Sequence, residues 1–306
     1  MPRYLIGRAI QFIPTLLGIY ILTFVMIRVL PGDPAQFLEG DRGDAQSLAA
    51  TRARLGIDEP LTTQFWIFLT DTLRGDLGRS FISNRPVANM IGEALPQTAV
   101  LGLFAMLIAV GVGVPLGITA ALSHNSIWDN LLRLVALIGV SIPVFWLGLQ
   151  LQILFGLQLR LLPVSGAGLD EHLVLPAIAA SFGLLAVLMR ITRSSLLEVL
   201  NQDFVRTAHS KGLSPRYVAR RHVLSNALLP IVTVWGTGLA GLLSGTLLVE
   251  VIFSYPGMGR LLVDSIGARD YPSVQGLVLT FALIYALMNL IVDAVYPLVD
   301  PRIRYS

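Results

Sequence analysis

Six long apolar runs constrain this chain of 306 residues more than any other feature of its sequence. Only 13% of the residues are charged, whereas about a quarter are charged in an ordinary soluble domain. A helix of about 20 apolar residues crosses the hydrocarbon core of a bilayer. The sequence therefore predicts an all-α integral membrane protein with about six transmembrane helices. The predicted spans are residues 9–30, 97–122, 130–157, 173–197, 227–252 and 276–297.

The composition narrows the chemistry that the chain itself can perform. It has no cysteine, and its four histidines lack the spacing of metal ligands. It also has no nucleotide-binding loop and no nucleophile elbow. We therefore expect no enzyme activity, no metal and no cofactor on this chain, so any driving ATP must bind elsewhere. The net charge of +3 comes mostly from loop arginines, which indicates membrane topology and not a nucleic-acid partner.

The first apolar run predicts the orientation of the chain in an inner or plasma membrane. It follows Arg3 and Arg8 and is too long for a cleaved signal peptide, so residues 1–30 are expected to form a helix with its N-terminus inside. Residues 31–96 are expected outside, because long loops are translocated largely regardless of charge. They contain a predicted amphipathic helix at about 60–74. Residues 97–306 then form the core domain, and six spans place both chain ends in the cytoplasm.

A polar, basic island at residues 203–230 separates the fourth and fifth predicted spans. Asp203 can cap a short helix, Gly212 can end it in the left-handed conformation, and Pro215 can begin a second helix. On charge alone, the island is a positive-inside loop that fixes topology. The helix–turn–helix pattern favours a rigid docking surface instead.

Glycines recur within two of the predicted spans. Those in residues 236–241 match the G-x-G-x-x-G pattern, but no strand precedes them and the run is apolar. Together with Gly111, Gly113 and Gly117, they are predicted to form close-packing helix faces.

Ionisable residues at membrane depth are candidates for a substrate pathway. Glu250 has two interpretations, a gating role or a carboxylate that anchors the external turn through backbone N–H groups. Arg133, Arg190 and Asp293 lie near helix ends, where snorkelling or a structural pair explains them equally well. The candidates for translocation or gating are Glu250, Tyr255, Asp293, Thr237 and Ser244.

A series of motifs extends over nearly the whole chain. They are PGDPA at 31–35, LGIDEPL at 55–61, GDLGRS at 75–80, SIPVFWLG at 141–148, LPVSG at 162–166, VEVIFSYPGMG at 249–259, RDYPSVQG at 269–276 and DPRIR at 300–304. In this order they resemble the permease subunits of the dipeptide/oligopeptide/nickel family of ATP-binding-cassette (ABC) importers, in particular the first permease of a dipeptide system.

The island is similar to the cytoplasmic motif of that family: E-A-A, three residues, Gly, nine residues, I-x-L-P. Gly212 matches the glycine, Ala208 the last alanine and Leu224 the leucine, while the other positions differ. The resemblance implies a coupling helix within residues 198–225 that docks on an ATPase, with Ala208 allowing close approach and charges forming the rim. The residues implied in coupling are Arg206, Thr207, Ala208, Lys211, Gly212, Leu213, Arg220, Arg221 and His222.

The resemblance also implies the function and the partners. The chain would form half of a pathway for dipeptides or oligopeptides, beside a second homologous permease and in contact with membrane lipid. Two ATPase subunits would bind ATP and Mg²⁺, and an extracytoplasmic peptide-binding protein would deliver the substrate. Permeases for nickel or glutathione look similar and stay open as alternatives. A secondary transporter or membrane-embedded enzyme is the alternative from another class, and it predicts repeated halves or convergent buried charges.

Overall fold

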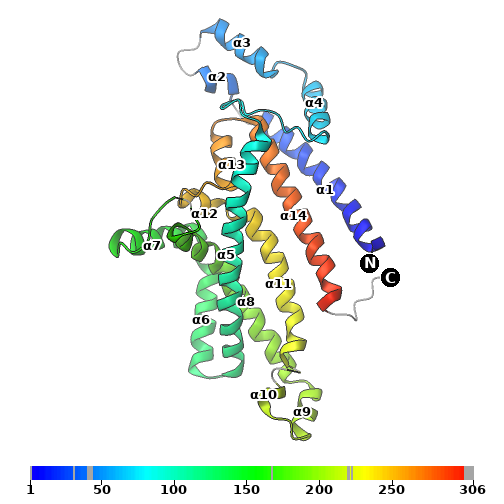
Figure 1. Ribbon diagram of the computed structural model, residues 1–306, viewed down its shortest axis with the longest axis vertical. Helices are drawn as coiled ribbons and strands as arrows, with labels where there is room; N and C mark the ends of the chain where they lie inside the picture. The colour runs from blue at the N-terminus through cyan, green and yellow to red at the C-terminus, as the bar shows by residue number, and fades with distance from the viewer. Residues whose placement is uncertain are drawn as a thin grey trace.

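The computed structural model describes residues 2–29, 32–39, 44–166, 168–218, 221 and 223–299. Within these residues every regular element is a helix, and strand-like pairing is limited to one bridge between Arg79 and Pro86. The predicted all-α class is therefore confirmed. The long helices run side by side along the molecule (Figure 1). The short helix α9 (Asp203–Ser210) lies near one end of the molecule, and α3 (Ala45–Leu55) lies at the other. The long helices are α1 (Pro2–Val29), α5 (Val87–Leu122), α8 (Val174–Leu200), α11 (Leu224–Gly245) and α14 (Tyr271–Val299).

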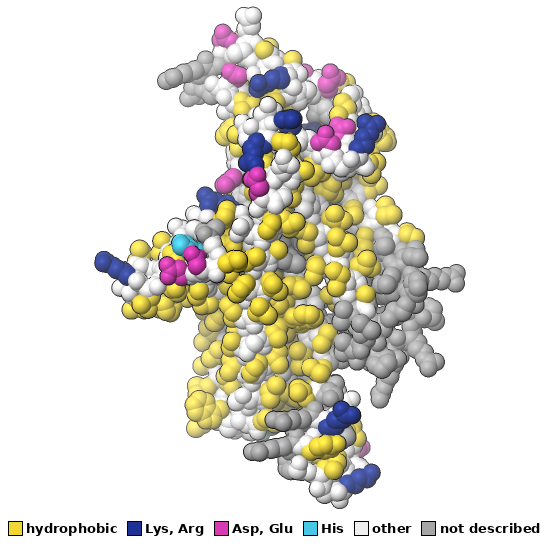
Figure 2. All heavy atoms as spheres, viewed as in Figure 1, with side chains coloured by type: hydrophobic (Ala, Val, Ile, Leu, Met, Phe, Trp, Pro, Cys, Tyr) yellow, Lys and Arg dark blue, Asp and Glu magenta, His cyan; other side chains and the backbone are white. Residues whose placement is uncertain are grey.

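The surface of the long helices is suited to lipid. Figure 2 shows hydrophobic side chains over the middle of the visible face, while charged side chains gather toward its two ends and beside α7 (Val144–Leu151). Four helices in the described part of the chain are long and apolar enough to cross a membrane: α1, α5, α8 and α14. A bent pair supplies up to one more, and α11 contains a shorter apolar stretch, Asn226–Leu242. The total of six spans stays a prediction.

Close contact between α5 and α8 forms the centre of the bundle. A Cβ atom added at Gly113 would lie 2.7 Å from the carbonyl oxygen of Leu185, and one at Gly117 would lie 2.6 Å from that of Met189. A Cβ at Gly236 of α11 would lie 2.6 Å from Val292 of α14. The absence of a side chain at these positions lets the helix backbones approach, as small residues do in membrane bundles. The predicted close-packing role is confirmed for Gly113, Gly117, Gly236 and Gly238, whereas a Cβ atom at Gly111 or Gly241 would meet open space.

The third predicted span, residues 130–157, is wrong as a single helix. The helix α6 (Ile127–Ser141) ends at Ser141, the next residue Ile142 has an extended ψ of 125°, and α7 begins after Pro143. The α6 segment and the segment from Val144 to Gln158 meet at 104°, so α7 points away from the bundle axis (Figure 1). Proline has no N–H to donate and disfavours the helical conformation in the residue before it.

The limits of three other predicted spans also change. The second helix begins at Val87 and not near residue 97, and the last begins at Tyr271 and not near 276. The fifth predicted span, 227–252, is divided, because α11 ends at Gly245. Two short helices follow it, α12 (Leu247–Ile252) and α13 (Met258–Gly267). Glu250 therefore lies on α12 and outside the long helix.

Three short helices follow α1, namely α2 (Pro34–Glu39), α3 (Ala45–Leu55) and α4 (Leu61–Leu73). The predicted amphipathic helix at 60–74 is confirmed as α4. Its Phe68 ring stacks on Tyr20 of α1 at 5.1 Å, and Phe65 meets the same ring edge-on at 5.5 Å. These ring contacts fasten α4 to the first helix, whereas Trp66 is 62% exposed.

A buried carboxylate joins the segment after α4 to the start of α14. Asp270 accepts hydrogen bonds from the Ser80 hydroxyl at 2.6 Å, the Phe81 amide at 2.8 Å and the Ser273 hydroxyl at 2.7 Å. Its side chain is almost completely buried. A buried carboxylate needs such donors, since an unpaired one is costly. The Asp270 cluster therefore fixes this segment to the bundle.

Candidate functional site

The predicted helix–turn–helix of the basic island is present between α8 and α11. The first helix, α9, covers Asp203–Ser210, and the second, α10, covers Pro215–Val218. Gly212 between them has a φ of +78°, and the Leu213 amide donates back to the Ala208 carbonyl at 3.4 Å. A Cβ atom at Gly212 would meet open space, so the left-handed backbone, and not crowding, favours glycine here.

The inner face of the island packs on its own chain. Val205 and Ala208 of α9 and Val218 of α10 are buried against Val199 of α8 and Ala121 of α5. Ala208 was expected to allow close approach of a partner. The structure instead uses its small side chain to bring α9 onto the bundle, which corrects that expectation. This core makes the island a rigid extension of α8.

The outer face of the island is exposed and partly apolar. We define it as the side chains of Phe204, Leu213 and Tyr217, which are 41%, 36% and 52% exposed, with the cations Arg206, Lys211 and Arg221. Arg206 is 4.0 Å from Asp203, but both are so exposed that this ion pair contributes little to stability. Exposed aromatic groups ringed by charge are typical of the centre and rim of a protein interface.

Sequence reasoning predicted Leu213 and the cations of this face but missed Phe204 and Tyr217. A signal for Phe204 was present, because adjacent helical residues lie about 100° apart. Phe204 and Val205 therefore cannot both point into a narrow buried face, and one of two neighbouring apolar residues must face outward. Thr207 is also exposed, with its hydroxyl bonded to the Asp203 carbonyl at 2.9 Å. Arg220 and His222 lie outside the described residues.

Glu250 holds the turn between α12 and α13. The side chain is fully buried and accepts from the Thr98 and Thr246 hydroxyls at 2.8 and 2.7 Å. Its other oxygen accepts from the amides of Gly259 and Arg260 at 2.7 and 3.1 Å, in the first turn of α13. A carboxylate at a helix N-terminus satisfies free N–H groups and complements the helix dipole. Of the two interpretations, the structure supports the anchoring carboxylate.

We call the turn between α12 and α13 the Glu250 elbow. Its packing also requires glycine next to the Glu250 carboxylate. A Cβ at Gly257 would lie 2.3 Å from the Glu250 carboxylate, and one at Gly259 would lie 2.5 Å from the Leu247 backbone. Tyr255 is fully buried, and its hydroxyl donates to Gln97 at 3.2 Å. Burial raises the pKa of the Tyr255 hydroxyl, which keeps it protonated as a donor. Tyr255 therefore supports the elbow.

Of the remaining pathway candidates, Thr237 is the one whose side chain the structure describes. Thr237 is exposed on α11, and its hydroxyl bonds the Thr233 carbonyl within the same helix at 3.0 Å. The side chains of Ser244 and Asp293 lie outside the part of the chain that the structure describes. Their roles in translocation stay predictions.

Replacing Glu250 with Gln should destabilise the elbow by about 2 kcal/mol, because the amide –NH2 cannot accept from the donors that surround the carboxylate. The measurement is the thermal unfolding midpoint of the purified permease. Glu93→Gln is the control, since Glu93 is an exposed carboxylate paired with Arg85. Loss of transport with an unchanged midpoint would contradict the anchoring role and favour direct gating.

Comparison with known proteins identifies a family for both the N-terminal and the C-terminal part of the chain. Residues 113–305 match the family described as binding-protein-dependent transport system inner membrane component, and residues 1–102 match the N-terminal part of such components. The chain is 42% identical over its full length to a glutathione transport system permease protein, GsiC, of Salmonella typhimurium, and 41% identical to GsiC of Escherichia coli (strain K12). Both comparisons cover 100% of each protein.

Solved structures of ABC transporters share the fold. The MetNI methionine ABC transporter in an inward-facing conformation matches with a TM-score of 0.56 at 17% identity, over 69% of this chain and 96% of that chain. An amino acid ABC transporter matches with a TM-score of 0.53 at 16% identity, over 68% and 94%. The chain therefore belongs to the family of binding-protein-dependent transport system inner membrane components and is a permease subunit of an ABC importer.

Proposed function

We propose that this permease forms half of the translocation pathway of an importer for short peptides, and that its outer face on α9 and α10 binds a cytoplasmic ATPase subunit. The observation that carries the coupling proposal is the exposure of Phe204, Leu213 and Tyr217 on a rigid element at one end of a bundle of bilayer length. An importer permease contains no ATP site of its own in this proposal. Force must therefore enter through a contact with the ATPase.

The side chains of the basic island suit a contact with an ATPase subunit. Exposed aromatic side chains supply most of the affinity when a partner covers them, and the surrounding cations set partner choice and association rate. The inner face, through Val205 and Val218, is continuous with the core made by α8 and α5. A displacement of α9 would therefore be transmitted to α8 through packed side chains. This arrangement supports coupling between the ATPase and the transmembrane helices.

The proposed complex contains a second homologous permease, two ATPase subunits and an extracytoplasmic binding protein that supplies the substrate. Because the outer face would bind a cytoplasmic subunit, the α9 end of the bundle lies in the cytoplasm and the α3 end lies outside. The predicted cytoplasmic chain termini agree with this orientation, and the loop arginines agree with the positive-inside rule.

The two substrate classes to compare are short peptides and nickel ions. The relatives named above are glutathione transport permeases, and glutathione is itself a tripeptide. This favours short peptides, glutathione included, over nickel ions. Peptide backbones need neutral hydrogen-bonding groups more than a fixed charge, which agrees with the neutral character of Thr237 on α11.

The double variant Phe204→Ala with Tyr217→Ala should weaken ATPase binding by roughly thirtyfold, since each aromatic anchor typically contributes more than 1 kcal/mol. The measurement is retention of the ATPase during affinity purification, titrated against added ATPase. Trp66→Ala is the control, because Trp66 is an even more exposed aromatic residue but lies on α4. Equal retention in the double variant and the control would rule out the outer face as the ATPase contact.

Substrate class can be tested with the complete importer in proteoliposomes that contain ATP. Uptake of a labelled dipeptide should be reduced by excess tripeptide and by glutathione, and unchanged by nickel. Competition by nickel alone would select the metal alternative. Uptake that proceeds without ATP would select the secondary-transporter alternative.

Orientation can be tested with single cysteines, because the native chain has none. Ser210→Cys, exposed at the end of α9, should react with an impermeant maleimide only in inside-out vesicles stripped of peripheral subunits. Ser83→Cys, exposed after α4, should react in intact spheroplasts. The reverse labelling pattern would invert the proposed topology.

A further inference from the structure

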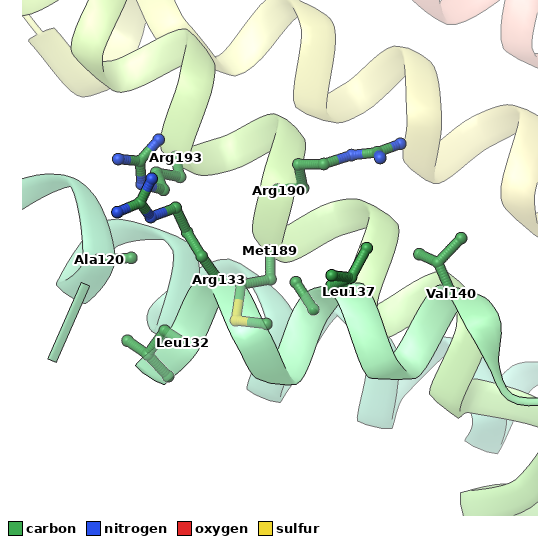
Figure 3. A pocket seen from close by; sticks show the side chains of 9 residues that line it. Ala120, Leu132, Arg133, Leu137, Val140, Met189, Arg190 and Arg193 are labelled. Atoms are coloured by element: carbon green, nitrogen blue, oxygen red, sulfur yellow. The ribbon is translucent and has the colours of Figure 1, made fainter. Parts of the chain in front are cut away.

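A cavity of about 410 Å³ opens between α5, α6 and α8. Most of its wall is apolar and includes Leu132, Leu137, Val140 and Met189. Three arginines complete the lining: Arg133 from α6, and Arg190 and Arg193 from α8. Figure 3 shows the guanidinium groups of Arg133 and Arg193 close to each other, whereas the Arg190 side chain extends in the opposite direction above the apolar side chains of α6. A cationic rim over an apolar wall is an unusual combination within a membrane bundle.

One of the three arginines has a structural partner. Arg193 donates to the fully buried Asp129 through two nitrogens, at 2.6 and 2.8 Å. Asp129 also accepts from the Asn125 amide at 3.0 Å and lies 3.4 Å from a His124 ring nitrogen. These bonds join the α5–α6 turn to α8. The carboxylate of Asp129 is thereby fully occupied by groups of its own chain.

The other two arginines leave the cavity with an excess of positive charge. Arg133 is about half exposed, hydrogen-bonds the neutral Asn130, and lies 3.8 Å from the same Asp129. Arg190 is exposed, and no carboxylate in the described part of the chain forms an ion pair with it. Arg133 and Arg193 thus share the one carboxylate of Asp129, and Arg190 has no carboxylate partner among the described residues. Two positive charges remain for an anionic ligand.

The three arginines lie about two to three helix turns from the α9 end of the bundle. Arg133 lies six positions after the start of α6, or about 9 Å along the helix, and Arg193 lies seven positions before the end of α8, or about 10 Å. Long arginine side chains at this depth extend toward the interface. The apolar wall continues from there toward Val140, deeper in the bundle. The outer side of α6 is also apolar and exposed at Leu134 and Leu137.

We propose that this cavity binds an anionic phospholipid of the leaflet at the α9 end. Arg133 would contact the phosphodiester, Arg190 would add positive charge to the same cavity, and an acyl chain would lie along Leu137, Val140 and Met189. A basic pocket between helices on the cytoplasmic side is a suitable site for an anionic headgroup. A zwitterionic lipid offers no net charge to balance the two unmatched arginines. The inference requires that the bundle crosses a membrane, but it does not depend on the proposed substrate.

The test is native mass spectrometry of the assembled transporter, titrated with phosphatidylglycerol or with phosphatidylcholine of the same chain length. Phosphatidylglycerol should bind at least tenfold more tightly. Arg133→Gln with Arg190→Gln should weaken its binding by roughly thirtyfold and leave phosphatidylcholine unchanged. Arg193 is kept because it holds Asp129. Arg74→Gln, an exposed arginine after α4, is the matched control and should behave as wild type.

Four outcomes would overturn the proposal. Equal binding of the two lipids would show that charge does not select the ligand. Unchanged phosphatidylglycerol binding in the double variant would place the lipid elsewhere. Displacement of bound lipid by millimolar glycerol 3-phosphate would show a site for soluble phosphate esters. Absence of any retained lipid, with a Leu137→Cys crosslink to the second permease, would likewise overturn it in favour of a subunit contact.

Discussion

The close contact of α5 with α8 is the packing interaction on which the rest of the molecule depends. In a lipid environment apolar burial does not drive helices together, so backbone proximity and dense van der Waals contact must do so. Gly113 and Gly117 provide this by leaving space for the carbonyls of α8. The helix α5 then supplies Thr98 to the Glu250 elbow and Ala121 to the core of the basic island, and α8 adds Val199 to that core. Both polar regions are therefore positioned by one helix pair.

The sequence predicted the features that depend on local chemistry. Apolar length indicated the long helices, and Gly212 and Pro215 located the turn and the restart of the island because each acts on its own backbone. The features that depend on distant partners were not predictable. Glu250 is bonded to Thr98, 152 positions earlier, so its anchoring role could be offered only as one of two interpretations. The third span was predicted as one helix through Pro143, where the structure instead bends by 104°.

The basic island shows why a motif position does not reveal which way a side chain points. Ala208 aligns with a family motif, yet it is buried within the chain. Phe204 has no place in that motif, yet it is exposed. A docking element must satisfy two surfaces at once, since it needs a firm attachment to its own bundle before it can transmit force from a partner. Residues that match a motif can serve the first requirement as readily as the second.

The Asp270 cluster has a consequence for the synthesis of the protein. Ser80 and Asp270 are separated by 190 positions, and their hydrogen bond joins the segment after α4 to the start of the last long helix. The ribosome makes the N-terminal partner first, and that partner must wait while four-fifths of the remaining chain is produced and inserted. Chains grow at about 5–20 residues per second, so the wait lasts on the order of ten seconds or more. Completion of this polar cluster is thus a late event in biogenesis, because its last partners are made only as α14 begins.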